Sequence, residues 1–466
     1  MFDNLIGQHE AKSLLEGDLR GGRLPPSILL AGPPASGKLT AALEIARVLS
    51  CESDDPGAWN CRCASCASHR FLAHPDLLLF GRRSFPEEIP AALDTLAAAP
   101  GKAGSYFFVR AVRKLVKRFE PVLWEGEESK LAKATPLVAD LEERLARIDP
   151  EGGMAGLKGS AEADALVSKT AEDILPIAVK LETFVPDMPP VAQVRAMEWW
   201  TRLAPWGRRK TVVIENADAM NESARNALLK ILEEPPSSVT IVLASARRQA
   251  IMLTILSRVR SYVFVERGAD AAKEVLAKVF RADVSRLEGL GPAVLTPERW
   301  LASKRAFPPE AARRFGTDFV AAVLAERLGQ GHVHGPAFAE AGETAASEGT
   351  DIAASLAAIL SGTKDLGQKD EAFANSFEAI LSAAEDSLSE TLRSRDFAPE
   401  DLSWMTESAD ILRETRRRRE EFNLPAATLL ETTAYRLRDL GPERAGPAIS
   451  GTARPGKWPG YGMVGS

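Results

Sequence analysis

A glycine-rich segment that ends in a lysine is the first part of this chain that could do chemistry. The string Gly32-Pro-Pro-Ala-Ser-Gly-Lys38 has the Gly-x4-Gly-Lys spacing of a phosphate-binding loop. In such loops the glycines let backbone N–H groups converge on a phosphate, and the lysine neutralises its outer oxygens. We therefore predict that Gly32, Ser36, Gly37 and Lys38 bind a nucleotide. The plainer alternative is a Gly/Pro turn that enters a helix, with a solvated lysine.

The positions that would handle magnesium and water are altered in this sequence. The pattern requires Ser or Thr as a magnesium ligand at position 39, which is Leu39, and Thr40 lies about 100° further round a helix. After the apolar run 211–214 an active site places an Asp and then a Glu, but this chain has Glu215 and Asn216. Glu215 could still reach a metal, whereas Asn216 cannot act as a base. We therefore expect Thr40 and Glu215 to take part in nucleotide binding (ATP or ADP), with absent or weak ATPase activity.

All four cysteines of the chain fall within one short segment. They are Cys51, Cys61, Cys63 and Cys66, and four thiolates at this spacing can close a tetrahedral zinc site. Cys63 and Cys66 have the usual spacing of a zinc-binding pair, whereas Cys61 and Cys63 are tightly spaced, so His69 is an alternative ligand. The competing interpretation is four small buried side chains or free thiols. We predict a zinc ion (Zn2+) held by the four cysteines.

Short apolar runs alternate with helical patterns around these residues. A buried strand at 27–31 precedes the glycine-rich loop and a helix at 40–49 follows it, which is the context that a phosphate-binding loop requires. Further strands are expected at 211–214, 240–244 and 261–265. Strands that alternate with helices predict an α/β fold, with a parallel sheet covered on both faces.

The rest of the chain is predicted to be helical. Residues 81–188 separate two pieces of the α/β domain and carry helical patterns, so we interpret them as a helical insertion with its own small packing surface. No strand is expected after residue 266. The Gly/Ala/Glu-rich stretch 329–349 is predicted to be a linker, and 441–466, which is rich in Gly and Pro, a flexible tail.

Composition limits the class of protein. A chain of 466 residues is long enough for about three domains, and 45% hydrophobic with 26% charged residues is typical of globular proteins. A formal net charge of −6 argues against a general nucleic-acid coat. No apolar run approaches the roughly 18 residues of a membrane span, and the charged N-terminus lacks the apolar core of a signal peptide. We therefore expect a cytoplasmic protein, in which clustered cysteines indicate metal before disulfides.

Several further motifs are more specific than composition. The most specific is the segment 221–236, Asn-Glu-Ser-Ala-Arg-Asn-Ala-Leu-Leu-Lys-Ile-Leu-Glu-Glu-Pro-Pro. Other characteristic segments are 2–8, the cysteine module, 74–76, 243–258 and 423–431. Together they resemble the bacterial clamp-loader subunits of DNA polymerase III, in the AAA+ class, over most of residues 2–80 and 189–266. The family's Ser-Arg-Cys motif stands here as Ser257-Arg258-Val259, and 81–188 has no recognised counterpart.

Within that family the chain looks most similar to the delta-prime subunit. The motor subunit, gamma/tau, keeps the loop Thr and an intact Asp-Glu pair, whereas delta-prime commonly has degraded nucleotide motifs and retains Ser-Arg-Cys. The resemblance implies a non-motor, stator-like subunit that helps to load the sliding clamp onto primed DNA. Its implied partners are gamma/tau and delta in a hetero-oligomeric ring. Arg258 would be an arginine finger supplied in trans to a neighbour's ATP, although a surface salt bridge is the plainer interpretation.

The resemblance also implies a domain order. Residues 1–266 would form the AAA+ domain, with a zinc module at 51–66 and the insertion at about 81–188. Residues 267–328 would form a helical lid, followed by the linker. Residues 350–440 would form an all-α collar for oligomerisation, with its last helix in the segment 423–431.

Two other functions remain open at this point. One is a gamma/tau-like motor that hydrolyses ATP, which Lys38 favours. The other is a zinc-bearing DNA-binding module on an AAA+ scaffold, which the cysteines and a run of four arginines favour. That run is Arg416, Arg417, Arg418 and Arg419, and a solvated helix face is its plainer interpretation.

Overall fold

The fold comes from a computed structural model. It describes residues 1–150, 161–288, 295–304, 309–332, 334–362, 377, 380–389, 399–422 and 426–440. The chain divides into two compact units, Met1–Pro308 and Pro309–Ser466, which are described separately here. The first unit holds the sheet and the second is helical where it is described. No described helix is long and apolar enough to cross a membrane.

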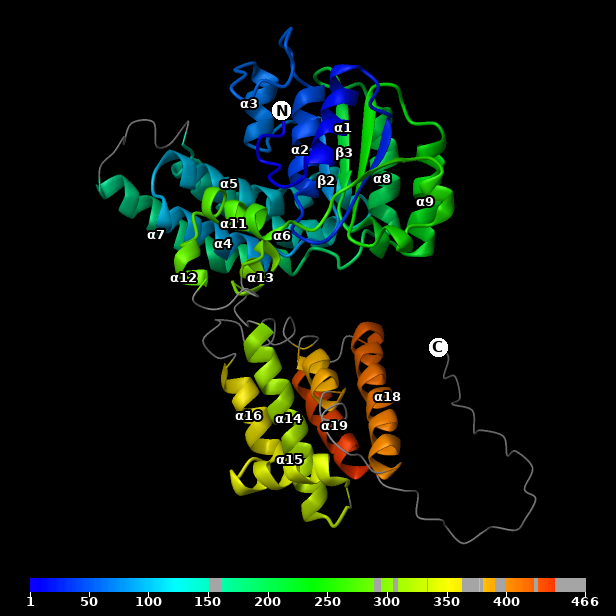
Figure 1. The fold of residues 1–466 in the computed structure, drawn as a ribbon. Coiled ribbons are helices and arrows are strands. Elements are labelled where there is room, and N and C mark those ends of the chain that lie inside the picture. Colours follow the sequence, from blue (N-terminus) through cyan, green and yellow to red (C-terminus); the bar gives the residue numbers. More distant parts are fainter. Residues whose placement is uncertain are drawn as a thin grey trace, which may run out of the picture. The chain divides into compact units, whose positions relative to one another are not determined.

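A five-stranded parallel sheet forms the centre of the first unit (Figure 1). Its spatial order is β2-β3-β4-β1-β5. The strands are β1 (Ser27–Ala31), β2 (Leu77–Phe80), β3 (Lys210–Ile214), β4 (Val239–Ser245) and β5 (Arg260–Val263). Every residue of the first four strands is buried, as expected for parallel strands covered on both faces. The predicted α/β fold with a parallel sheet is therefore confirmed.

Alternate residues of each strand enter two different cores. Leu29 of β1 lies in a buried cluster with Leu78, Val212 and residues of the helices that follow β2. Ile28 and Leu30, on the other face, lie in a cluster with residues of the first two helices. Successive side chains of a strand point to opposite faces of the sheet. Because both faces are buried here, the strand sequences are apolar at every position.

The helices of the first unit follow the strands along the chain. They are α1 (His9–Arg20), α2 (Lys38–Leu49), α3 (Ala64–Arg70), α4 (Phe85–Ala98), α5 (Lys102–Val116), α6 (Glu128–Arg147), α7 (Ala161–Glu182), α8 (Val191–Arg202), α9 (Glu222–Glu233), α10 (Leu253–Leu256), α11 (Ala269–Lys278), α12 (Val284–Glu288) and α13 (Pro297–Ala302). Strand β2 was not predicted from the sequence, although Pro75 and Asp76 precede its four apolar residues and Gly81 follows them.

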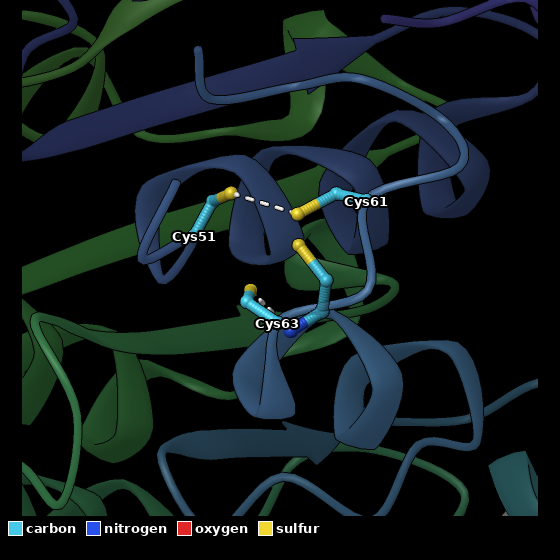
Figure 2. Close-up of side chains that lie close together, drawn as sticks. Cys51, Cys61 and Cys63 are labelled. Carbon is cyan, nitrogen blue, oxygen red and sulfur yellow. Dashed lines mark hydrogen bonds between the residues drawn. The ribbon is translucent and has the colours of Figure 1, made fainter. Parts of the chain in front are cut away.

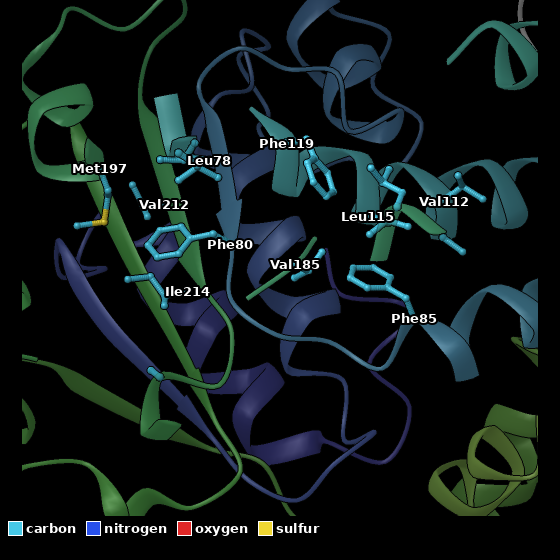
Figure 3. Packing of buried hydrophobic residues seen from close by; sticks show 14 of the residues in the cluster. Leu78, Phe80, Phe85, Val112, Leu115, Phe119, Val185, Met197, Val212 and Ile214 are labelled. Atoms are coloured by element: carbon cyan, nitrogen blue, oxygen red, sulfur yellow. The ribbon is translucent and has the colours of Figure 1, made fainter. Parts of the chain in front are cut away.

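Helices α4 to α7 pack mainly on one another, and their apolar residues also join the buried cluster of the sheet. Phe85, Phe108 and Leu115 share one buried cluster with Phe80 of β2 and Ile214 of β3, and Figure 3 shows several of these side chains together. The segment 81–188 was predicted to have a small packing surface of its own. In the structure its helices do pack on one another, and their apolar residues also continue into the buried cluster of the sheet, so this packing surface is not separate from the main core.

The second unit is built from helices where it is described. They are α14 (Pro309–Gly329), α15 (Pro336–Ser347), α16 (Ile352–Gly362), α18 (Pro399–Phe422) and α19 (Ala426–Asp439). Helix α14 ends at Gly329, next to the predicted lid boundary at residue 328, and α15 lies within the stretch 329–349 that was predicted to be a linker. The predicted domain bounds stay predictions. Segment 423–425 and the predicted tail 441–466 lie outside the described residues.

Candidate nucleotide pocket and cysteine cluster

The predicted phosphate loop joins β1 to α2. Its first glycine permits a close approach, since a Cβ on Gly32 would lie 2.3 Å from the carbonyl oxygen of Phe264. Its last glycine, Gly37, precedes α2 with a φ of 102°, which favours glycine. The loop therefore reaches the N-terminus of α2 through two positions that other residues would strain.

A pocket of about 560 Å³ opens at the carboxyl edge of the sheet. This is where parallel α/β sheets bind ligands, because the loops that follow the strands meet there. Five of the predicted nucleotide-binding residues line it, namely Ser36, Gly37, Lys38, Thr40 and Glu215. The sixth, Gly32, lies at the start of the same loop.

Lys38 is turned towards its own loop. Its Nζ donates to the carbonyl oxygens of Gly32 and Pro33, each at 2.6 Å. Burial lowers the pKa of Lys38 to about 8, an effect that the carboxylate of Glu215 partly opposes. The ammonium is therefore held in the pocket by two carbonyl dipoles, in the place where a phosphate oxygen would accept from it.

The side chain at position 39 belongs to the core. Leu39 is 6% exposed and lies in the cluster beneath α2 with Leu43 and Ile28. Thr40 lines the pocket and carries the hydroxyl that Leu39 lacks. A magnesium ligand from position 39 is therefore excluded by the residue type and by its packing.

Glu215 is held by two arginines from the segment 81–188. Arg83 Nη1 donates to one carboxylate oxygen at 2.7 Å, and Arg118 Nη2 donates to the other. Glu215 is 7% exposed and Arg118 is 2% exposed, so this ion pair is buried. Burial lowers the pKa of Arg118, although Glu215 opposes the effect. The two guanidinium groups therefore occupy acceptor sites of this carboxylate and compete with a metal ion for it.

The ion pairs continue to Glu88 and Lys114. Arg83 Nε and Lys114 Nζ both donate to the carboxylate of Glu88. Burial alone would raise the pKa of Glu88, but Arg83 and Lys114 outweigh it and hold the pKa at about 2. The charged form of Glu88 thus persists through the neutral range.

A third arginine clamps the phosphate loop. Arg267 donates from Nη1 to the carbonyl of Ala35 at 2.5 Å and from Nη2 to that of Ser36 at 2.9 Å. Three arginines were not predicted from the sequence: Arg83 and Arg267, which line the pocket, and Arg118, which lies behind the lining. No motif could have revealed them, because only tertiary packing brings these three separated positions to the loop.

The four cysteines converge into one cluster (Figure 2). One ligand atom from each of Cys51, Cys61, Cys63 and Cys66 lies within 4.8 Å of the others. Cys51 Sγ and Cys61 Sγ are 3.7 Å apart, close to the edge of about 3.8 Å that Zn–S bonds of about 2.3 Å give in a tetrahedron. Burial raises the pKa of Cys63, but backbone N–H groups of Glu52 and Cys66 outweigh it and lower the pKa to about 7. The donor set therefore fits a zinc ion.

His69 stands apart from the cysteine cluster. Its ring stacks on that of His74 with centroids 4.1 Å apart, and neither of its nitrogens has a partner among the described residues. Burial, with His74 as a further cause, lowers the pKa of His69 to about 2, so the ring is neutral. Among the described residues, the group that could hold a metal ion consists of the four cysteines and does not include His69.

Arg258 is exposed between α10 and β5. Its Nη2 donates to Glu233 at 2.7 Å, and its Nη1 donates to the carbonyl oxygen of Thr254 at 2.8 Å. A surface ion pair of this kind contributes little stability and is easily exchanged for another anion. Arg258 is therefore placed where a neighbouring molecule could reach it.

The run of four arginines lies in α18 of the second unit. Arg416 pairs with Glu385 at 2.6 Å, and Arg418 pairs with Glu414 at 2.8 Å. Arg419 lies over the ring of Phe377, 4.8 Å from its centroid. These contacts favour the interpretation as a helix face over a DNA-binding patch.

A glycine-rich loop at the carboxyl edge of a parallel sheet defines an α/β domain of the phosphate-loop class, and the fold fits an AAA+ clamp-loader-like domain. The family described as "DNA polymerase III, delta subunit" matches residues 7–126 and 164–267, and the chain belongs to this family. Both matched stretches lie in the first unit.

Two curated relatives carry the name DNA polymerase III subunit delta'. The one from Pseudomonas aeruginosa is 40% identical over 89 residues, which is 19% of this chain and 27% of the relative. The one from Bacillus subtilis is 35% identical over 74 residues, which is 16% of this chain and 22% of the relative. The matches thus span about a quarter of each relative's length.

A solved structure from Thermotoga maritima, titled as a DNA polymerase III gamma subunit-related protein, is also similar. It is 18% identical, with a TM-score of 0.25, and the match covers 57% of this chain and 89% of that one. At that TM-score the likeness adds nothing to the family assignment.

The family match corrects the extent of the predicted insertion. Residues 81–188 were predicted to have no counterpart in the family, but the match continues from β2 to residue 126 and resumes at residue 164. Helices α4 and α5 therefore belong to the family's own domain. The residues between the two matched stretches are 127–163, which include α6.

Proposed function

We propose that this chain is a stator-like, delta-prime-type subunit of a DNA polymerase III clamp loader. In this role it helps to load the sliding clamp onto primed DNA without acting as a motor itself. Its partners are gamma/tau and delta subunits in a hetero-oligomeric ring. Membership of the DNA polymerase III family and the names of the two curated relatives support the proposal.

The observation that carries the proposal is the state of Glu215. A motor needs a free carboxylate at the end of β3 to support magnesium and to polarise the attacking water. Here both carboxylate oxygens accept hydrogen bonds from arginines, and Leu39 supplies no oxygen. The gamma/tau-like motor is therefore the weaker proposal.

Arg258 gives the stator a role in its neighbour's reaction. We infer that it leaves Glu233 and reaches the γ-phosphate of ATP held by an adjacent motor subunit. A guanidinium there stabilises the charge that develops on the phosphoryl oxygens during transfer. Its exposure and its exchangeable ion pair with Glu233 support this role.

We further propose that Cys51, Cys61, Cys63 and Cys66 hold a zinc ion. When bound, the ion supplies a structural cross-link between α2 and α3 and no chemistry on the nucleotide. Arg47 supports the site, because its Nη1 donates to Cys66 Sγ at 3.3 Å. A helical lid after residue 266 and a helical collar in the second unit complete the proposed architecture.

The proposal is tested by ATP hydrolysis by the purified full chain in Mg2+. We expect no turnover above the blank, for the wild type and for Lys38→Ala alike. ATP turnover by the wild type that is lost in Lys38→Ala would establish a motor subunit and contradict the stator role. A third result, salt-dependent DNA binding that a zinc chelator abolishes, would favour the DNA-binding module instead.

A further inference from the structure

Basic side chains from distant segments line the nucleotide pocket. They are Lys38, Arg82, Arg83, Lys114 and Arg267, and the acidic residues of the lining are Glu87, Glu88, Glu215 and Glu298. Arg118 lies behind them, fully buried, with its Nη1 lacking a partner among the described residues. The pocket is thus built around fixed positive charge in the region where a working site would hold a metal.

Arg83 is held in the pocket wall by two carboxylates. Its Nε donates to Glu88 and its Nη1 donates to Glu215, so two carboxylates fix the guanidinium plane. Burial lowers the pKa of Arg83, but Glu88 and Glu215 outweigh it and the net pKa is raised, which keeps the group charged. Its Nη2 donates to no atom of the described residues, and a quarter of the side chain (25%) stays exposed. A guanidinium held in this way has one donor nitrogen left for a ligand in the pocket.

We propose that this pocket binds the polyphosphate of a nucleotide without a divalent cation, and that Arg83 supplies the positive charge that magnesium supplies elsewhere. This inference rests on the proposed nucleotide site and concerns which group neutralises the negative charge of the phosphates. Guanidinium groups bind phosphate oxygens through directed, charge-assisted hydrogen bonds. The two positions that usually serve magnesium are weakened here, because Leu39 has no oxygen and Glu215 is paired with Arg83 and Arg118.

The first experiment titrates the full chain with fluorescently labelled ADP, once in EDTA and once in Mg2+. We expect the two dissociation constants to agree within about twofold. Inorganic pyrophosphate should displace the labelled ADP in EDTA, since the phosphates are what the site recognises. Binding that is more than about tenfold tighter in Mg2+, no binding at millimolar ADP, or displacement by adenosine but not by pyrophosphate would each overturn the proposal.

Three variants test the role of Arg83. Arg83→Ala should weaken ADP binding in EDTA by about tenfold or more, whereas Arg147→Ala, an exposed arginine of α6 paired with Glu143, should not. If Arg83→Ala does not fold, Arg83→Lys keeps a cation between Glu88 and Glu215 but loses the directed donors of the guanidinium, so it should also weaken ADP binding in EDTA. Glu215→Gln is a further variant that preserves the side-chain volume. It removes a negative charge beside Arg83, so ADP should bind more tightly, with or without Mg2+. Weaker binding of ADP to Glu215→Gln in Mg2+ would show that Glu215 serves a metal.

These measurements separate the site from the stator role. Binding is measured on the isolated chain, and Arg83 lies at the pocket, whereas Arg258 acts on a neighbour's nucleotide. A chain that fails to bind ADP while the Arg258→Ala loader loses hydrolysis would overturn only the metal-free site. A chain that binds ADP in EDTA while Arg258 has no effect would overturn only the stator's trans role.

Discussion

Lys38 combines a motif with an unusual environment. The spacing of the loop places it at the start of α2, and packing then leaves it only partly exposed. With a pKa of about 8 it is mostly charged at neutral pH, but it lies much closer to deprotonation than an ordinary lysine. A phosphate would replace the two carbonyl oxygens as the acceptor and would favour the charged form.

The pH dependence of nucleotide binding tests this account of Lys38. The ammonium is present below its pKa of about 8 and is lost as the pH rises through that value. The affinity for ADP should therefore fall between pH 8 and 9.5, by up to about tenfold per pH unit. Titration with labelled ADP in EDTA measures this, and Lys38→Arg should remove the decline because a guanidinium stays charged. An affinity of the wild type that is flat over this range would contradict the assignment.

The site residues that could be predicted from the sequence are set by local structure, and those that could not are set by tertiary packing. Gly37 and Lys38 act through local backbone geometry, which a motif records. The four cysteines are brought together by short loops, so their spacing in the sequence also identifies them. Arg83 and Arg118 reach Glu215 from positions 132 and 97 residues away along the chain, and no local pattern encodes such a pairing.

At the scale of elements, helices α4 to α7 pack on one another and extend the buried cluster of the sheet beyond its strands. Their apolar positions were recognised as helical, but their packing partner was not, because amphipathicity gives the buried face and not what covers it. The strands β1, β3 and β4 were predicted from apolar runs. Strand β2 was missed, since four apolar residues alone do not distinguish a strand from a helix segment.

Helix α6 should contribute to the stability of the whole first unit. Leu141 is fully buried in the cluster shared with the sheet. Leu141→Ala should lower the free energy of unfolding by about 2–5 kcal/mol, because it leaves a cavity in that core. Leu166→Ala, in α7 and 46% exposed, is the matched control and should change it far less. Equal effects of the two substitutions, measured by urea denaturation, would show that α6 does not pack as described.

The cysteine module makes a separate prediction at the same scale. Metal analysis of the purified chain should find one zinc per chain, and a chelator should lower the melting temperature, because the metal ties α3 to the end of α2. Cys63→Ser should lose the zinc. Arg62→Ala changes an exposed neighbour and should retain it. Full zinc content in Cys63→Ser, or none in the wild type, would contradict the site.

At the scale of the whole molecule, the family match lies within the first unit and does not extend into the second. The matched stretches 7–126 and 164–267 lie in the first unit, which holds the pocket, the cysteines and Arg258. The second unit lies beyond the match and consists of helices where it is described. The collar predicted for it from the segment 423–431 remains a prediction. The charge balance of −6 suits a chain whose proposed partners are mainly proteins.

The most direct test of the stator is ATP hydrolysis by a reconstituted loader that carries Arg258→Ala in this subunit. The trans role predicts that clamp- and DNA-stimulated hydrolysis falls by about 10³-fold at the neighbouring site, while the ring still assembles. Arg248→Ala, an exposed arginine nearby, is the control and should leave hydrolysis unchanged. Glu233→Gln should preserve it too, because it only frees Arg258 from its ion pair. Unchanged stimulated hydrolysis in the Arg258→Ala loader would contradict the central claim.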